Sequence, residues 1–288
     1  MRKSEFVLKR VILFLWILLI AAHALSAATL ATFETSVGNM ELEFYDEDKP
    51  VTVSNFVKYV TSGRFTNQFV QRWAPKFVIQ GGGYQVTNTT NGLKIVPIQP
   101  FGQITNEYSV GRTFSNTNGT IAMARGSGKD SASSQWFLNL TNNAFLDQVN
   151  GGFTVFGRVT AGMDVLNLFV PPPPTHNIYS FDIGITPQGE GTPVIGNATN
   201  VAQLFAGLIY VDIKLRRDLA LTINPLAHGE KKITWNTVAG VTNGLEYSSA
   251  VIPGSWTVYT NLLGSGSAYS LIDPSNDPER IYRVTLKY

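Results

Sequence analysis

Apolar and polar residues alternate from Thr29 to Tyr45. Met40, Leu42 and Phe44 would share one face of a strand and Glu41 and Glu43 the other, because successive side chains point to opposite faces. Gly38–Asn39 separates two such alternating halves, which predicts a β-hairpin. We interpret the two glutamates as a solvated strand face rather than a catalytic carboxylate pair.

The period then changes to that of a helix. One apolar helix face, with the spacing i, i+3, i+4 and i+7, is formed by Val53, Phe56, Val57 and Val60. Acidic residues and Pro50 mark its start and Gly63 its end. A second, shorter helix is expected at 161–169. Residues 65–160 are otherwise short β-prone runs broken by Gly and Asn, so the pattern predicts a mainly antiparallel barrel with two helices covering its openings.

The pattern is interrupted at Val170 by VPPPPTHNIYS. We interpret its four prolines as a stiff surface connection, with a target for a proline-binding module as the alternative. The run at 209–217 predicts one more strand that closes the barrel. After the turn-rich stretch NPLAHGEKK come five β-prone runs separated by Gly, Pro, Asn and Ser, which are typical of a small β-sandwich.

These changes of pattern predict the domain organisation. We expect a first domain at 29–215, with an extended connection at 170–208, then a linker at 216–230 and a small β-sandwich module at 231–288. Residues 1–27 are expected to be a signal peptide.

The signal peptide is predicted from a basic start, a short apolar run from Val11 to Ala22, and the small residues of HALSAATLA. The apolar run is shorter than the roughly 20 residues that a membrane-spanning helix needs, so we expect cleavage near Ser26–Ala28 and no stable membrane span after processing. An uncleaved N-terminal anchor is the alternative. The predicted location is outside the cytoplasm, in the periplasm or the extracellular space of a bacterium.

Composition and charge exclude several classes of functional site. Of 288 residues, 44% are hydrophobic and 15% are charged, as in ordinary globular proteins. Loss of the leader removes four cations and Glu5 and changes the formal net charge from +2 to −1, and no basic run remains for nucleic acid. Zero cysteines exclude disulfides and thiolate sites. His23, His176 and His228 are too scattered for a metal site or a catalytic triad, so we expect no metal and no cofactor.

A second hairpin is expected at 69–81. Most of it lies in the stretch RWAPKFVIQGGGY, which covers residues 72–84. With its turn near Lys76, Arg72 and Gln80 are equidistant from the turn and face each other across the strand pair. Gln80 could then hold the guanidinium of Arg72 by a hydrogen bond. The glycines that follow would let another segment or a ligand backbone approach closely.

Two further stretches complete a recognisable set: GTIAMARGSGKDSASSQWFLNL at 119–140 and FLDQVNGGFTVFGRVTAGMDVL at 145–166. Together with FVIQGGGY they resemble the cyclophilin family of peptidyl-prolyl cis–trans isomerases, in the family's order and spacing, over roughly Thr29 to Leu215. ITNE at 104–107 is similar to the bacterial branch. The resemblance implies an eight-stranded antiparallel barrel capped by two helices, in agreement with the pattern above.

The resemblance also implies site residues. Arg72 matches the catalytic arginine and Gln80 its glutamine neighbour. The substrate-binding positions that it implies are Phe77, Val78, Ala124, Arg125, Gly126, Gln135, Phe137, Phe145, Leu146 and Phe153. The sequence departs from the family pattern at Gln71, where a histidine is frequent, at Phe145, in the place of a tryptophan, and at Phe153, near the place of a pocket histidine.

The implied activity is isomerisation of Xaa-Pro bonds in proline-containing polypeptides, by an exported enzyme that assists protein folding. A guanidinium aimed at the proline nitrogen would stabilise the twisted amide, and this chemistry requires no nucleophile or metal. A proline-peptide-binding or adhesion module with little catalysis is the alternative function. The sandwich module loosely resembles bacterial fibronectin-type appendages and could bind an unknown surface partner.

Overall fold

The computed structural model describes residues 29–219, 221–237, 242–249, 256–265, 267–275 and 277–287. The predicted signal peptide lies outside the described residues. In the part of the chain that the structure describes, no helix has the length and apolar character needed to cross a membrane.

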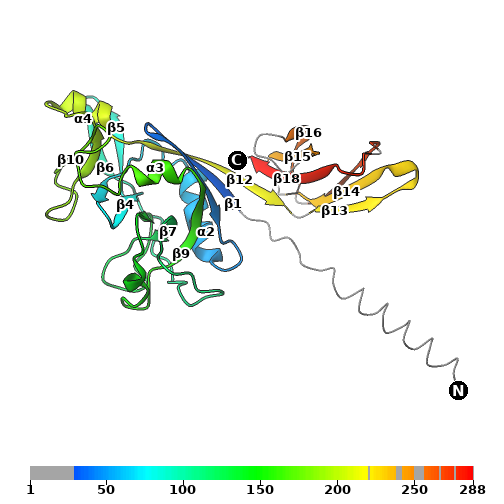
Figure 1. Cartoon of the computed structure of the whole chain (residues 1–288), viewed down its shortest axis with the longest axis horizontal. Helices are drawn as coiled ribbons and strands as arrows, with labels where there is room; N and C mark the ends of the chain where they lie inside the picture. The colour runs from blue at the N-terminus through cyan, green and yellow to red at the C-terminus, as the bar shows by residue number, and fades with distance from the viewer. Residues whose placement is uncertain are drawn as a thin grey trace, which may run out of the picture.

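Eight antiparallel strands form the barrel (Figure 1). In sheet order they are β12 (Val211–Leu219), β1 (Thr29–Thr35), β2 (Gly38–Phe44), β9 (Val155–Ala161), β7 (Thr120–Met123), β8 (Trp136–Asn139), β4 (Val78–Gly81) and β3 (Arg72–Ala74). The residues before β3 meet those before β12, since the Val70 amide donates to the Ile209 carbonyl at 2.9 Å and the Val211 amide to the Gln68 carbonyl at 3.0 Å. The predicted eight-stranded barrel and its last strand are therefore confirmed.

The first hairpin has the expected alternation but a different turn. Met40, Leu42 and Phe44 are buried, and Glu41 is exposed, as predicted for a solvated face. Thr35 pairs with Gly38, so residues 36–37 make the turn and Gly38 belongs to β2. The expected turn at Gly38–Asn39 was wrong by two residues, because Gly38, at a φ of +128°, opens the second strand.

Helix α2 (Pro50–Thr61) covers one opening of the barrel and α3 (Met163–Asn167) is the second predicted helix. Val53, Phe56 and Tyr59 are buried in the barrel core, where the Phe56 ring lies edge-on to Phe44 at 5.0 Å. The apolar helix face that the spacing predicts is therefore the face that packs inward.

The start of α2 is fixed by a residue far away in the sequence. The Glu107 carboxylate accepts hydrogen bonds from the Val51 amide at 3.1 Å and the Thr52 amide at 2.7 Å. Backbone amides in the first turn of a helix have no partner within the helix, and a negative charge is stabilising at this end. Lys49, which is 1% exposed, donates to the Glu107 carbonyl at 2.8 Å, and its burial lowers its pKa. The acidic residues before Pro50 do not lie in the first turn of the helix.

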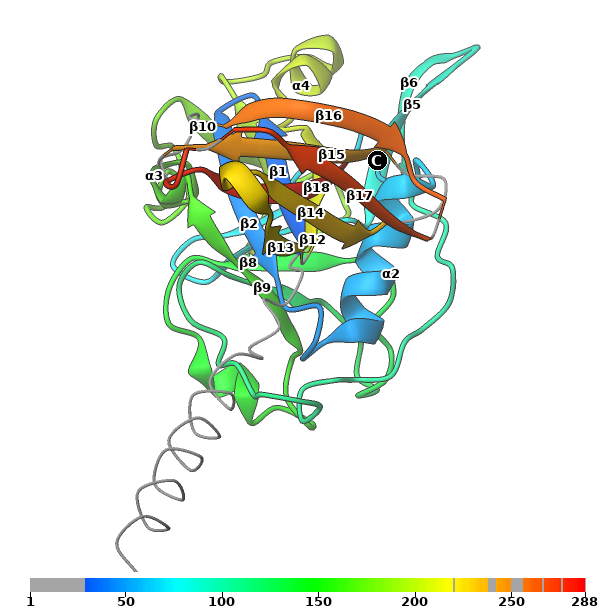
Figure 2. The same cartoon turned by 90° about the vertical axis from the view of Figure 1, so that its right-hand side faces the viewer.

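Further elements decorate the barrel. The hairpin of β5 (Tyr84–Thr89) and β6 (Gly92–Pro97) projects from the body (Figure 2). A 3-10 turn, η1 (Ala144–Asp147), follows β8. The long connection 170–208 is itself folded, with β10 (Ile178–Phe181) paired to β11 (Thr192–Ile195) and a short helix α4 (Val201–Gly207).

The C-terminal module is a sandwich of two sheets, and all five predicted β runs are strands. β16 (Thr257–Leu263), β15 (Thr242–Ser248) and β18 (Ile281–Lys287) form one sheet, and β13 (Leu221–Pro225), β14 (Lys231–Asn236) and β17 (Ala268–Asp273) form the other. Its buried core consists of Ile233, Trp235, Leu245, Tyr282 and Val284.

The segment 216–230, expected as a linker, is largely strand. β12 pairs with β1 up to Arg217 and with β18 from Arg216 to Leu219, so a single strand belongs to both the barrel sheet and the sandwich (Figure 1). β13 and a 3-10 turn, η2 (Ala227–Gly229), follow it. The division of the chain into two folding units stays a prediction.

Asp273 is a buried carboxylate of the C-terminal module with several hydrogen-bond donors. It is 1% exposed and accepts hydrogen bonds from the Tyr282 hydroxyl, from Arg280 Nη1 at 2.8 Å and from the Ser275 amide at 2.9 Å. Burial raises the pKa of this carboxyl, but the hydrogen bonds outweigh burial and the pKa lies below its ordinary value. The carboxylate therefore stabilises the folded chain at neutral pH, and this contribution disappears as the pH falls through the lowered pKa.

We predict that Asp273→Asn lowers the free energy of unfolding of the C-terminal module by roughly 3 kcal/mol at pH 7, because it leaves Arg280 without its partner. In thermal denaturation followed by circular dichroism, the gap between parent and variant should narrow as the pH falls below about 4. Asp212→Asn is the matched control, because Asp212 is 65% exposed where it pairs with Lys214. Equal stability of Asp273→Asn and parent at pH 7 would refute the assignment.

Candidate active site

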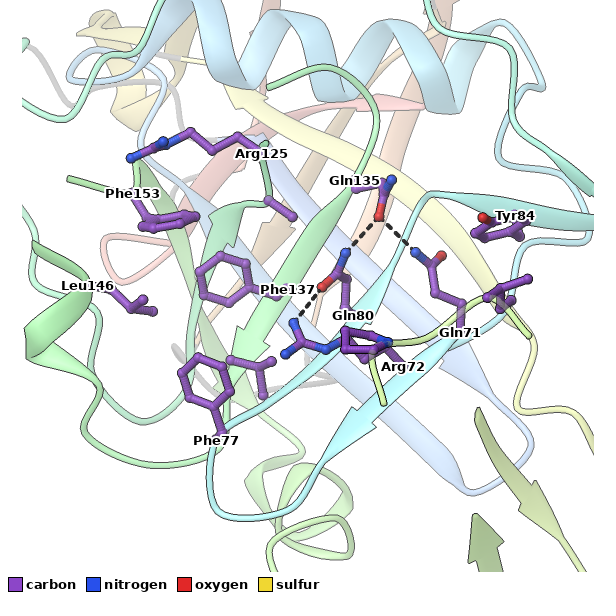
Figure 3. Close-up of a pocket in the computed structure, with 14 residues that line it drawn as sticks. Gln71, Arg72, Phe77, Gln80, Tyr84, Arg125, Gln135, Phe137, Leu146 and Phe153 are labelled. Atoms are coloured by element: carbon purple, nitrogen blue, oxygen red, sulfur yellow. Dashed lines mark hydrogen bonds between the residues drawn. The ribbon is translucent and has the colours of Figure 1, made fainter. Parts of the chain in front are cut away.

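The hairpin of β3 and β4 places Arg72 directly opposite Gln80, as the symmetric position of the two residues about the turn predicted. Arg72 Nη1 donates to Gln80 Oε1 at 3.0 Å. Lys76 in the turn has a φ of +59°, a left-handed conformation that reverses the chain. The guanidinium points toward the labelled aromatic rings of the pocket (Figure 3).

A chain of three glutamine side chains continues from Arg72. Gln80 Nε2 and Gln71 Nε2 both donate to Gln135 Oε1, at 2.6 and 2.8 Å, and the Gly83 amide donates to Gln71 Oε1 at 2.8 Å (Figure 3). A guanidinium and a backbone amide can only donate, so both ends of the chain fix which way each glutamine amide points. The network therefore transmits a defined orientation to Arg72.

The three glycines after Gln80 accommodate the chain's own side chains. A Cβ on Gly81 would meet the Trp136 ring within 2.8 Å, and one on Gly83 would lie 2.9 Å from both Gln71 Oε1 and Gln135 Cδ. Gly82 has a φ of +77°, and its Cβ would be 2.5 Å from the Ser134 carbonyl oxygen. The close approach inferred from the sequence is thus made by another segment of the protein.

A cavity of about 400 Å³ lies beside this network. Its lining includes Phe77, Val78, Ala124, Gln135, Phe137, Leu146 and Phe153, together with Arg72, Gln80 and Arg125. Phe137 is 4% exposed, and its ring meets Phe153 edge-on at 5.9 Å. The structure therefore brings ten of the twelve residues expected from the sequence to one cavity, with a cation beside an apolar wall.

The other two expected residues lie next to the cavity. Gly126 lines an adjoining hollow with Gln80, Ala124 and Gln135. Phe145 is 59% exposed at the rim, where its ring stacks against Phe77 at 5.8 Å.

The side chain of Arg125 has a different environment from that of Arg72. Its guanidinium lies 4.3 Å from the centre of the Phe153 ring and donates to the carbonyls of Val149 and Asn150 at 2.9 and 3.0 Å. Burial lowers its pKa. Arg125 therefore holds the loop at 147–153 against the cavity wall.

Several residues of the site were not predicted from the sequence. Tyr84, Ile185 and Pro187 line the cavity, and Glu190 forms an ion pair with Arg72. Three of these four belong to the long connection 170–208, whose folding no local pattern indicated. Among the described residues, no group of three or more His, Cys, Asp or Glu side chains could hold a metal ion.

Comparison with known proteins shows which family the chain resembles. The family model "Cyclophilin type peptidyl-prolyl cis-trans isomerase/CLD" matches residues 30–171. A peptidyl-prolyl cis-trans isomerase of Acinetobacter baylyi is 43% identical over 162 residues, covering 56% of this chain and 81% of the relative. The corresponding isomerase A of Dickeya dadantii is 42% identical, covering 50% of this chain and 72% of the relative. Isomerase B of Escherichia coli is 36% identical, and the match covers 48% of this chain and 82% of the relative.

Among solved structures, a cyclophilin type peptidyl-prolyl cis-trans isomerase of Cryptosporidium parvum, determined in the presence of the dipeptide Ala-Pro, matches with a TM-score of 0.41 and 20% identity. The match covers 64% of this chain and 96% of that structure.

We predict that Gln135→Leu lowers the free energy of unfolding by roughly 2 kcal/mol, because the amides of Gln71 and Gln80 lose their common acceptor. Thermal denaturation measures the change, and Gln99→Leu, at an exposed position, is the control. A crystal structure of the variant should show Gln80 turned from its present orientation. An unchanged Gln80 and an unchanged melting temperature would show that the network does not orient it.

Proposed function

The chain belongs to the cyclophilin family of peptidyl-prolyl cis–trans isomerases, and we propose that it isomerises Xaa-Pro bonds by electrostatic stabilisation of the twisted amide at Arg72. The observation that supports this mechanism is the guanidinium itself, held by Gln80 beside an apolar cavity lined by Phe77 and Phe137. The substrates are proline-containing polypeptides, and their class follows from the family.

The reaction is rotation about an amide bond. Resonance of the nitrogen lone pair holds the bond planar, with a barrier of about 18–20 kcal/mol. Half-way through rotation the lone pair is localised on the proline nitrogen, which becomes a hydrogen-bond acceptor. A donor aimed at this nitrogen binds the twisted amide more strongly than the planar one, and such differential binding is catalysis. An acceleration of about 10⁵ corresponds to roughly 7 kcal/mol.

The cavity supports this chemistry in two ways. The apolar side chains of Phe77, Phe137 and Leu146 can receive the proline ring and exclude water, which strengthens any charge interaction inside. Residues Ala124–Gly126, which follow β7, border the cavity and the adjoining hollow, where their backbone could pair with an extended substrate. Binding of the proline ring and pairing with the substrate backbone would then hold the Xaa-Pro amide against Arg72.

We further propose that the enzyme is exported, acts on proteins folding outside the cytoplasm, and uses its C-terminal sandwich to bind a surface partner. The basic, apolar and small-residue segments of 1–27 support export. The sandwich has its own buried core around Trp235 and Leu245, separate from the catalytic cavity, which supports a distinct role for this part of the chain.

We predict that Arg72→Ala lowers kcat by about a hundredfold or more while peptide affinity changes little, because Arg72 acts mainly on the twisted amide. Arg72→Lys should also be poor, since an ammonium cannot reproduce the planar fork that Gln80 orients. Phe137→Ala is the contrasting variant, expected to weaken peptide binding and to lower stability by roughly 3 kcal/mol. A protease-coupled assay on an Ala-Pro peptide gives the rate, and isothermal titration gives the affinity.

The same measurements distinguish the proposed isomerase from a proline-peptide-binding module. If folded Arg72→Ala retains near-parental kcat, the guanidinium is not the catalyst. If the parent binds proline peptides well but does not accelerate isomerisation, the chain is a binding module.

We predict that mass spectrometry of the protein from its native host finds an N-terminus near Ser26–Ala28. Leu15→Arg should block processing, because it places a charge in the middle of the apolar run. A native mass that includes residues 1–22 would instead identify an uncleaved anchor.

A further inference from the structure

A loop from the long connection reaches the catalytic arginine. Residues 182–191 join β10 to β11, and two of them, Ile185 and Pro187, line the cavity together with Arg72. Two hydrogen bonds close the loop on itself, from the Glu190 amide to the Pro187 carbonyl at 3.1 Å and from Thr186 Oγ1 to the Glu190 carbonyl at 3.0 Å. Neither of these two hydrogen bonds uses the Glu190 side chain.

The backbone that follows Glu190 is attached on both sides of Arg72. The Trp73 amide donates to the Gly191 carbonyl at 2.7 Å, and Thr192 Oγ1 donates to the Gln71 carbonyl at 2.7 Å. Gly191 fits this position because a Cβ there would lie 2.9 Å from the Phe181 carbonyl oxygen. The two residues after Glu190 are thus bound to the two neighbours of Arg72, which sets the distance between carboxylate and guanidinium before any substrate binds.

The Glu190 carboxylate binds one edge of the guanidinium with both oxygens. Oε1 accepts from Arg72 Nη2 at 2.8 Å, and Oε2 accepts from Nε. Gln80 holds the opposite edge through Nη1. The side chains of Arg72 and Glu190 are only 21% and 23% exposed. Bidentate pairs of this type fix the plane of the guanidinium as well as its position.

The contacts leave a defined set of donors for the substrate. A guanidinium has five N–H groups, of which Glu190 accepts two and Gln80 accepts one. Among the residues that the structure describes, the acceptors leave one N–H on Nη1 and one on Nη2, side by side at the tip of the guanidinium. These two are the donors that can reach an amide in the cavity.

We propose that Glu190 is a positioning residue for the isomerase, which holds the guanidinium of Arg72 so that its two terminal N–H groups face the proline amide. This inference rests on the proposed function of Arg72. With Gln80 alone, the guanidinium could turn about a single hydrogen bond, and a donor that is misplaced by about 1 Å loses much of its catalytic effect. The negative charge of Glu190 also lowers the positive potential that Arg72 presents to the amide, and this effect opposes the gain from orientation.

The decisive variant is Glu190→Gln, which keeps the size of the side chain but replaces one acceptor oxygen with a donor amide. We expect kcat to fall roughly tenfold and KM to change less than twofold, because the cavity that binds the proline ring is intact. Glu190→Asp, which keeps the charge on a shorter side chain, should recover part of kcat. Asp182→Asn is the matched control in the same loop, where Asp182 accepts from the Gly184 amide at 2.9 Å and does not contact Arg72.

A double-mutant cycle shows whether Glu190 acts through Arg72. In an Arg72→Ala background, Glu190→Gln should produce no further loss of kcat. An unchanged or increased kcat in Glu190→Gln, with circular dichroism showing a folded protein, would overturn the proposal, as would an equal loss in both backgrounds. The proposed function fails separately, if Arg72→Ala itself retains parental activity.

Discussion

A half-buried guanidinium acts on an amide only if its orientation is fixed, and this constraint organises the site. Arg72 lies between Gln80 and Glu190, each of which accepts from a different edge of the guanidinium. The strand pairing of β3 with β4 places Gln80, and hydrogen bonds between the backbone around Arg72 and residues 191–192 place Glu190. The donor pair that remains at the tip is thereby directed toward the apolar wall without reorganisation during the reaction.

The rigidity of the scaffold has a physical origin in its packing. Trp136 fills the space that Gly81 and Gly82 leave open, and it lies edge-on to Phe33 at 5.2 Å across the barrel core. A larger residue at either glycine would displace the backbone next to Gln80, because interiors are packed at crystal-like density. Trp136 therefore connects the core of the barrel to the backbone that carries Gln80.

The sequence predicted features that depend on local pattern. The alternation on either side of Lys76 was sufficient to pair Arg72 with Gln80, and the apolar spacing was sufficient for α2. It did not predict Glu190 beside Arg72 or Glu107 at the start of α2, because these partners are 118 and 55 residues apart. The periodicity of apolar residues indicates whether a segment is a helix or a strand, but not which distant loop will contact it. For the same reason, the sequence did not predict that β12 continues beyond the barrel sheet and pairs with β18 of the sandwich.

The central proposal is that the oriented guanidinium accelerates rotation of a bound Xaa-Pro amide. Two-dimensional NMR exchange spectroscopy tests it directly, because it measures cis–trans interconversion of a proline peptide at equilibrium with a catalytic amount of the mature protein. We expect cis–trans exchange cross-peaks within about a second, against an uncatalysed time of tens of seconds or more. Peptide resonances that shift on binding while exchange stays at the uncatalysed rate would contradict it.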